Sequence, residues 1–495
     1  MPERNSGILL HITSLPGKEG IGTLGKNAME WIDFLQETKQ RLWQILPLGP
    51  VNVGNCPYQC FSAFAGNPLL IDLQLLVNEG LLEDTDLAAI PKYDIRQVEF
   101  SKVTSWKTEK LKRAFTHFRE KDHPAMLQEY DRFLSEHSWW LSDFALFMAI
   151  RQDFPGKSWT SWPEELKRRN AEALSQIREK HSMEVDYQTF LQFLFFRQWN
   201  SLKNYANSKN VHIIGDIPLY VAGDSADVWA NPHLFLLDDQ LQAAKVSGVP
   251  PDYFSTTGQL WGTPVFNWEN LKQQEYHWWL ARIHFNLKMF DQVRIDHFRG
   301  LEAFWSVPAG EKTAERGEWV EARGTEMLEI LRNQLGSIPL IAEDLGTITP
   351  EVERMRDRFN MPGMKVLQFG FSTDQTNEHL PHNFTANSVV YTGTHDNDTV
   401  WAWLHAAGST EKKLAQEYLK NYHPRPVWGM IEMAWASVAS TAIIPLQDLL
   451  ELGAESRMNI PGIAEGNWGW RFRWDQIKNK HKVFLKEITV KYNRS

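Results

Sequence analysis

The amino-acid sequence predicts an α/β fold, a (β/α)8 TIM barrel with inserted, mostly helical subdomains. Eight short apolar runs each end in polar residues, and helical patterns lie between most of them. Strands of a parallel sheet are buried on both faces and therefore form continuous apolar runs. In barrels of this class the functional side chains follow the C-terminal ends of the strands. We expect a single barrel domain over residues 1–495.

The expected strands are spread along the whole chain. They lie within residues 7–15, 41–49, 211–220, 290–298, 339–346, 365–371, 388–396 and 441–450. Helical patterns occupy residues 26–39, 186–207, 270–290, 324–335 and 349–359. The last begins with Thr349 in position to cap the helix and Pro350 at the first helical position. Such alternation of strands and helices is typical of a parallel barrel.

Two stretches fall outside this alternation. Residues 50–210 separate the second and third runs and contain charged helical sequence such as SWKTEKLKRAFTHFREK. This interval is too long for one crossover, so we expect a helical insertion over about residues 70–205, between barrel strands 2 and 3. Residues 246–268 are rich in glycine, proline and aromatic residues. A long loop in a compact domain is usually functional, so we interpret this stretch as an active-site loop.

Composition limits the classes of partner. The net charge is −9, the pI is about 6.0, and charges of both signs are spread along the chain, which gives no basis for a nucleic-acid partner. No apolar stretch has the length of a membrane helix, the N-terminus lacks the apolar run of a signal peptide, and two cysteines are too few for a secreted disulfide framework. We therefore expect a cytoplasmic protein with no membrane partner, either a monomer or a homodimer.

Two short motifs suggest cofactors or metals on first inspection. GIGTLG, residues 20–25, matches a dinucleotide-binding fingerprint, but PGKEG separates it from the preceding strand and no acidic residue ends the next strand. Cys56 and Cys60 are close enough in sequence for a metal or redox site, yet no second cysteine pair completes a zinc site. We interpret them as reduced packing residues around Tyr58, with a reversible disulfide left open.

Acidic residues follow several of the later strands. Arg294 and Asp296, in VRIDHFRG, are two residues apart and therefore share one face of a strand. An arginine beside an aspartate favours the carboxylate that a nucleophile needs, although a structural ion pair would have the same pattern. The acids that end two further runs are Glu343, Asp344, Asp396 and Asp398. Acids that converge on the C-terminal face of a barrel indicate an active site, and two carboxylates suffice to cleave a glycosidic bond.

Metal binding and serine catalysis are the rival uses of such residues. The available histidines are His297, His379, His382 and His395, and none belongs to an H-E-x-x-H motif. His379 and His382, in HLPH, are more typical of a loop than of a metal site. No serine lies on a G-x-S-x-G elbow. We therefore expect no metal site and no Ser–His–Asp triad.

Six longer motifs carry a family resemblance. They are CPYQCFSAFAGNPLLIDL, GDIPLYVAGDSADVWANP, GQLWGTPVFNW, VRIDHFRG, IAEDLG and YTGTHDNDT. Together they resemble the 4-α-glucanotransferases known as amylomaltases or disproportionating enzymes, glycoside hydrolase family 77. The resemblance extends from GILLHITSLPG near the N-terminus to GNWGWRFRW at residues 466–474, almost the whole chain.

The resemblance implies roles for the matching residues. Asp296 would be the nucleophile, Glu343 the general acid/base and Asp396 the transition-state stabiliser. The substrate contacts that it implies are Tyr58, Asp216, Trp261, Arg294, His297, His395, Asp374, His382 and Asn467. Tyr58 and Trp261 would be aromatic platforms beside the cleaved bond, and aromatic rings stack well on sugars. No cofactor is implied, because one glycosidic bond replaces another.

The reaction that the resemblance implies is a transfer. A segment of an α-1,4-glucan or malto-oligosaccharide would pass to the 4-hydroxyl of another glucan or of glucose, through a retaining double displacement. The alternative is an α-1,4-glucan hydrolase of the amylase type, which gives the same intermediate to water. A carbohydrate-binding scaffold with an inactive barrel is a third hypothesis, and the presence of all three carboxylates argues against it.

Overall fold

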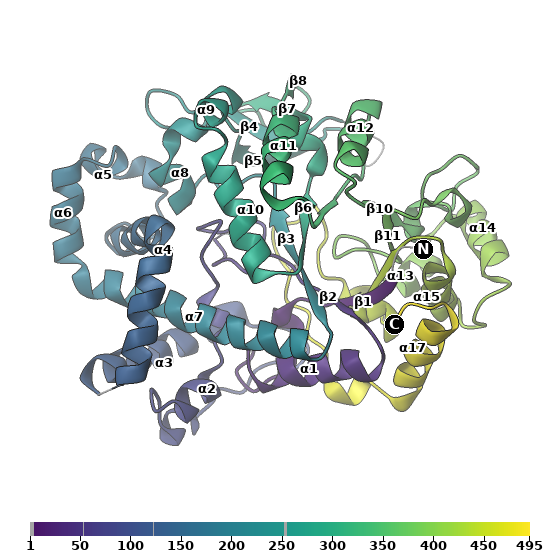
Figure 1. Ribbon diagram of the computed structural model, residues 1–495, viewed down its shortest axis with the longest axis horizontal. Helices are drawn as coiled ribbons and strands as arrows, with labels where there is room; N and C mark the ends of the chain where they lie inside the picture. Colours follow the sequence, from purple (N-terminus) through teal and green to yellow (C-terminus); the bar gives the residue numbers. More distant parts are fainter. Residues whose placement is uncertain (1–3, 53, 122, 252–254) are drawn as a thin grey trace.

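A computed structural model describes residues 4–52, 54–121, 123–251 and 255–495 (Figure 1). Within these residues eight parallel strands close into a barrel, each paired with the next barrel strand along the chain and the last paired with the first. Each overlaps one predicted run, which confirms the (β/α)8 fold. The strands are β1 (Asn5–Leu9), β2 (Leu42–Gln44), β3 (His212–Pro218), β6 (Gln292–Asp296), β9 (Leu340–Ala342), β10 (Gly363–Val366), β11 (Ser388–Tyr391) and β12 (Thr441–Pro445).

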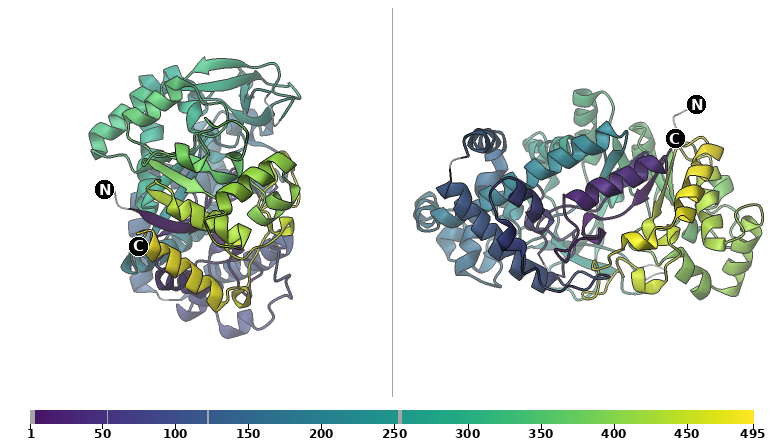
Figure 2. Two further views of the ribbon diagram at one scale, coloured as in Figure 1. Left: turned by 90° about the vertical axis from the view of Figure 1, so that its right-hand side faces the viewer. Right: turned by 90° about the horizontal axis from the view of Figure 1, so that it is seen from below.

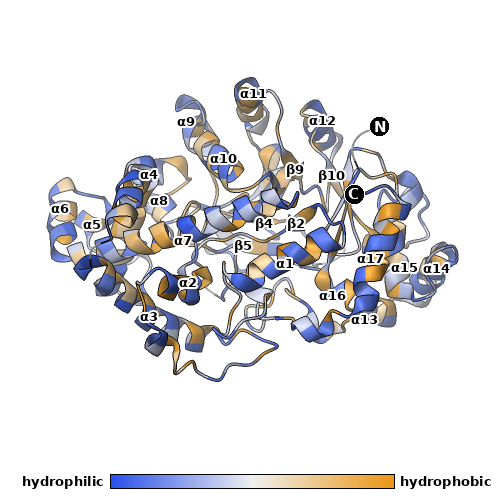
Figure 3. Cartoon of the chain, turned by 60° about the horizontal axis from the view of Figure 1, so that its bottom comes forward, coloured by the Kyte–Doolittle hydropathy of each residue, from blue (hydrophilic) through white to orange (hydrophobic). Residues whose placement is uncertain are grey.

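The barrel is held together by burial of its apolar strands and of one face of each surrounding helix. Val293 and Ile295 of β6 are completely buried, and burying a side chain of this size contributes roughly 1.5–3 kcal/mol. Helix α1 (Lys26–Glu37) buries Trp31 and Leu35 in the same core and leaves its charged residues outside. Figure 3 shows this division on α1 and on α17 (Asn479–Lys491), each with an apolar and a polar side.

Between β2 and β3 the chain is largely helical, and these helices form the left side of Figure 1. Helices α4 (Pro124–Ile150) and α7 (Ser182–Ser208) pack along each other through aromatic contacts, such as that of Phe133 with Phe193. The same continuous core joins them to the barrel, so the limits of the insertion at about residues 70–205 stay a prediction. The helices are α2 (Leu73–Asn78), α3 (Phe100–Glu120), α4 (Pro124–Ile150), α5 (Glu164–Lys167), α6 (Ala171–Lys180) and α7 (Ser182–Ser208).

A second, antiparallel sheet lies beside the barrel, at the top of Figure 1. Its strands, in spatial order, are β5 (Gln259–Pro264), β4 (Lys245–Val249), β7 (Ala303–Pro308) and β8 (Glu318–Glu321). The stretch 246–268 therefore contains two paired strands in place of an irregular loop, and residues 252–254 within it lie outside the described residues. Gly248 obscures the strand pattern, because the close approach of the two strands leaves no space for a Cβ there.

The remaining helices surround the barrel. Those within residues 270–290, 324–335 and 349–359 were predicted, with one difference, whereas the helix over residues 226–230 and those after residue 399 were not predicted. The helix expected over residues 270–290 is interrupted at Glu275 and Tyr276, whose left-handed φ values of 50° and 57° cannot continue a helix. The Tyr276 hydroxyl instead donates to Glu326 at 2.8 Å. The helices are α8 (Ala226–Ala230), α9 (Trp268–Gln273), α10 (His277–Met289), α11 (Gly324–Leu335), α12 (Pro350–Arg358), α13 (Val400–Ala406), α14 (Ser409–Leu419), α15 (Pro426–Ala436) and α16 (Leu446–Leu449).

The two ends of the described chain lie side by side in both views of Figure 2. Arg494 fixes this arrangement, since its Nη1 donates to the carbonyl oxygen of Asn5 at 3.2 Å. Among the described residues, no helix combines the length and the apolar character needed to cross a bilayer.

Candidate active site

Arg294 forms the centre of the predicted site. It lies on β6 in register with Asp216 of the neighbouring strand β3, so the two side chains share one face. Arg294 Nη1 donates to both carboxylate oxygens of Asp216, at 2.9 and 2.8 Å, and lies 2.9 Å from Oδ1 of Asp296. Burial raises the pKa of Asp216 to about 6, and Arg294 opposes this shift. One buried guanidinium therefore binds two of the predicted carboxylates.

Glu343 follows β9, the strand that pairs with β6 on its other side. Two backbone N–H groups hold its carboxyl: that of His297 donates to Oε2 at 2.6 Å and that of Leu345 to Oε1 at 2.9 Å. Burial raises the pKa of Glu343 to about 8; Arg294 opposes the shift and Asp296 adds to it. At neutral pH Glu343 therefore keeps its proton, while Asp296 forms an ion pair with Arg294.

The neighbouring Asp344 points away from the site, as expected for adjacent residues in an extended segment. Its Oδ2 accepts a hydrogen bond from Arg356 at 2.6 Å, and its Oδ1 accepts one from the Met364 N–H at 2.7 Å. These contacts satisfy a buried carboxylate within the fold. Asp344 therefore stabilises the strand ends, and Glu343 is the acid of this pair that enters the site.

His297 connects the site with the second sheet. Its backbone is left-handed, with φ 56°, and its N–H donates to Glu343. Its ring packs edge-on against Trp261 of β5, with the ring centroids 4.7 Å apart. Burial lowers the pKa of His297 to about 3, so the ring is neutral. His297 therefore contacts both the candidate acid/base and the aromatic wall.

Tyr58 spans the site from the loop after β2. Its hydroxyl donates to Oδ2 of Asp216 at 2.8 Å, and its ring stacks on His395 with the centroids 5.2 Å apart. Trp468 packs against both rings at 5.9 Å. Burial raises the pKa of Tyr58, which keeps the hydroxyl protonated as a donor. Tyr58 therefore links the Asp216 side of the barrel to the His395 side.

The two cysteines that flank Tyr58 are free thiols. Cys60 lies with its Sγ 3.0 Å from the carbonyl oxygen of Pro57. Burial raises the pKa of Cys56 to about 11, so it is not a thiolate at neutral pH. Among the described residues, no three histidine, cysteine or acidic side chains gather as metal ligands would.

Asp396 lies on the far side of the site, after β11. Its Oδ1 accepts a hydrogen bond from Asn459 Nδ2 at 2.6 Å and lies 3.4 Å from Nε2 of His395. The side chain is 44% exposed, compared with 31% for Asp296. All three predicted carboxylates thus follow barrel strands at one end of the barrel, and Asp396 and Asp296 are open to a ligand.

Three of the predicted glucan contacts lie in loops with their own hydrogen bonds. Asp374 is exposed and accepts from the backbone and hydroxyl of Thr376, and His382 hydrogen-bonds to the hydroxyl of Tyr418 at 2.8 Å. Asn467 braces a turn by accepting from the Ile460 N–H at 3.0 Å. Within the described chain their polar contacts are with these loops, so their role in binding stays a prediction.

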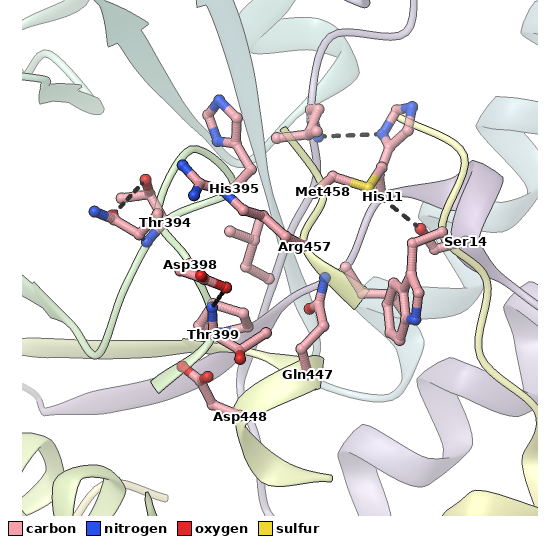
Figure 4. Close-up of a pocket in the computed structure, with 16 residues that line it drawn as sticks. His11, Ser14, Thr394, His395, Asp398, Thr399, Gln447, Asp448, Arg457 and Met458 are labelled. Carbon is pink, nitrogen blue, oxygen red and sulfur yellow. Dashed lines mark hydrogen bonds between the residues drawn. The ribbon is translucent and has the colours of Figure 1, made fainter. Parts of the chain in front are cut away.

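The sequence did not predict several residues that support the active site by hydrogen bonding to its loops. Figure 4 shows a pocket next to His395, lined by His11 from the segment after β1 and by Arg457 from the segment after α16. His11 Nδ1 accepts a hydrogen bond from the Leu46 N–H, and burial lowers the pKa of His11 to about 3. Arg457 and Asn459 both bind Asp396. No sequence motif identifies Arg457 and Asn459 as site residues, because they lie about 60 residues beyond Asp396 in the chain.

The fold and these carboxylates together define a class of protein. A barrel that presents a protonated Glu343 beside an ion-paired Asp296 at the ends of adjacent strands is a TIM-barrel enzyme of the kind that acts on glycosidic bonds.

The chain belongs to the 4-alpha-glucanotransferase family, glycoside hydrolase family 77, whose family model matches residues 10–477. It is 49% identical to the 4-alpha-glucanotransferase of Synechocystis, over all of this chain and 99% of that protein. It is 45% identical to the 4-alpha-glucanotransferase of Thermus thermophilus, over 98% of both chains. The solved amylomaltase of Streptococcus agalactiae, in complex with acarbose, is 41% identical with a TM-score of 0.96 and full coverage of both chains. These matches confirm the resemblance predicted from the sequence motifs.

Proposed function

We propose that this chain transfers a segment of an α-1,4-glucan to the 4-hydroxyl of another glucan or of glucose, by a retaining double displacement. The observation that carries the proposal is the pairing of Glu343 and Asp296. They end adjacent strands, and burial keeps Glu343 protonated while Arg294 offsets the charge of Asp296. Retaining chemistry needs one protonated carboxyl and one carboxylate on either side of the same bond.

In the first half-reaction Glu343 donates its proton to the glycosidic oxygen as that bond breaks. An oxygen of Asp296 attacks the anomeric carbon, and a glucosyl ester of Asp296 forms while the released part of the glucan leaves. Asp396, open to solvent on the opposite side, stabilises the positive charge that develops on the sugar ring.

In the second half-reaction Glu343 acts as a base. Esterification removes the negative charge of Asp296, which had helped to raise the pKa of Glu343, so the carboxylate form becomes easier to reach. Glu343 takes the proton of the acceptor 4-hydroxyl, and the acceptor oxygen attacks the anomeric carbon of the glucosyl ester, breaking its bond to the Asp296 oxygen. The new glycosidic bond forms and Asp296 is released as a carboxylate.

Aromatic walls favour a sugar acceptor over water. Tyr58 lies between Asp216 and His395, and Trp261 packs against His297 beside Glu343. Rings in these positions suit stacking on a glucose unit, and an occupied site excludes water from the ester. The names of the relatives support transfer over the hydrolase alternative. Asp374, His382 and Asn467 are proposed as outlying glucan contacts.

Incubation of the purified protein with maltotriose tests the proposal. A transferase produces glucose and a ladder of longer oligosaccharides while the total number of reducing ends stays constant. A rise in reducing ends would indicate the hydrolase, and unchanged maltotriose would contradict both enzymes. The cytoplasmic location and the monomer or homodimer state remain predictions that fractionation and light scattering can check.

A further inference from the structure

The segment Arg457–Trp468 folds over the loop that carries His395 and Asp396. Its first part is attached by the Asn459 N–H, which donates to the carbonyl oxygen of His395 at 3.1 Å. Its two ends are joined by the Trp468 N–H, which donates to the carbonyl oxygen of Met458 at 2.8 Å. Both ends of the segment therefore lie against the Asp396 side of the site.

Two side chains of this segment divide the contacts to Asp396 between them. Arg457 holds the backbone: its Nη2 donates to the carbonyl oxygen of Asp396 at 2.5 Å, and its Nε donates to that of Asn459 at 2.8 Å. Figure 4 shows Arg457 extending toward the loop of Thr394 and His395. Asn459 holds the carboxylate, with Nδ2 2.6 Å from Oδ1 of Asp396.

This division has an electrostatic consequence. A guanidinium on the carboxylate would offset the negative charge with which Asp396 stabilises a cationic transition state. The Asn459 amide is neutral, so it fixes one carboxylate oxygen and leaves the charge of Asp396 available. Arg457, which does carry a charge, is directed at backbone oxygens. His395 Nε2 lies 3.4 Å from the same carboxylate oxygen, and the charge of Asp396 adds to the effect of burial in raising the pKa of Cys56 and of Tyr58.

We propose that Asn459 is a positioning residue for Asp396, orienting its carboxylate toward the developing charge without neutralising it. This inference rests on the proposed function, because it assigns a partner to the stabilising carboxylate. A side chain that is 44% exposed has room to rotate, and the amide of Asn459 restricts that rotation. Asn459 then acts on the transition state more than on substrate binding.

The first test is Asn459→Ala, with kcat and KM measured on maltotriose. We expect kcat to fall by about 10-fold to 100-fold, as misplacement of a catalytic group does, with KM changed little. The matched control is Asn170→Ala. Asn170 also makes hydrogen bonds through its side chain, but it accepts them from two backbone N–H groups and caps α6, at the far left of Figure 1. Its loss should leave both constants unchanged.

The second test is Asn459→Asp, which keeps the shape of the side chain and so guards against a variant that fails to fold. Two carboxylates at this distance resist simultaneous ionisation, so the acidic limb of the pH profile of kcat should move to higher pH. The limb would not move if the side chain at position 459 did not contact the Asp396 carboxylate in the working enzyme. An unshifted acidic limb would overturn the proposal.

Two further results with Asn459→Ala would also overturn it. One is a kcat equal to that of the Asn170→Ala control. The other is an increased KM at constant kcat, which would make Asn459 a sugar contact. The unmodified protein is assayed in parallel. If it leaves maltotriose unchanged, the proposed function fails; if it transfers normally and Asn459→Ala does so too, only the positioning role fails.

Discussion

The backbone N–H of His297 donates a 2.6 Å hydrogen bond to Oε2 of Glu343. Because His297 directly follows Asp296, the two candidate catalytic carboxyls are connected through a single residue. Their relative position is therefore set by backbone geometry as well as by the pairing of β6 with β9. Such pre-organisation lowers the cost of orienting groups during the reaction.

Replacing Glu343 by glutamine should abolish most activity and preserve the fold. The glutamine side chain keeps an oxygen for a backbone N–H but has no acidic proton, so kcat should fall by about 100-fold to 10,000-fold. Circular dichroism and maltotriose turnover measure the two effects. Glu353→Gln, at an exposed position on α12, is the control and should remain fully active. Near-normal turnover by Glu343→Gln would contradict the assignment of the acid/base.

The pH profile should show a basic limb set by Glu343. Burial raises its pKa to about 8, so the proton that the reaction needs is present below that pH and is lost as the pH rises through it. We expect initial rates of maltotriose disproportionation to decline with a midpoint near pH 8. A decline already complete at neutral pH, or none well above pH 8, would be inconsistent with Glu343 as the proton donor.

Tyr58→Phe should weaken activity most strongly on the acid side. The hydroxyl donates to Asp216 and helps to keep it ionised, so its loss should raise the pKa of Asp216 further above about 6 and weaken the ion pair with Arg294. A lost hydrogen bond to a charged group corresponds to about a 10-fold to 100-fold drop in kcat/KM. The ratio of variant to parent activity should be lower at pH 6 than at pH 7.5, and a constant ratio would refute this explanation.

Two substitutions of His297 separate its backbone role from its ring. Asparagine tolerates the left-handed φ of 56°, whereas β-branched valine does not. Both variants lose the ring contact with Trp261, but only His297→Val should also misdirect the N–H that binds Glu343. We therefore expect His297→Val to lose considerably more kcat than His297→Asn. Equal losses would show that only the ring matters.

The sequence predicts the barrel well because buried parallel strands leave a strong local signal. Val293 and Ile295 are typical: they share one face of β6, both are completely buried, and Asp296 ends the strand. The second sheet was missed since β4 and β5 contain Gly248 and Gly262, which weaken the strand pattern. The break at Glu275 and Tyr276 was missed as well, because it depends on a tertiary hydrogen bond to Glu326.

The active site likewise combines residues that a local sequence pattern predicts with contacts that only the tertiary fold creates. Asp296 and Glu343 follow their own strands, so the sequence places them at one end of the barrel. Glu343 stays protonated because burial raises its pKa despite the opposing effects of Arg294 and the His297 N–H, and no local pattern encodes that burial. Asn459 reaches Asp396 across 63 residues of chain, and only the folded structure brings the two together.

The most direct measurement is a search for the covalent intermediate. Glu343→Gln is incubated with α-glucosyl fluoride, whose leaving group needs little acid assistance, so the ester should form and then persist without a base to activate an acceptor. Peptide mass spectrometry should find one glucosyl unit on Asp296. A glucosyl unit on another residue, or a variant that consumes the fluoride with no labelled peptide at any time, would contradict a double displacement through Asp296.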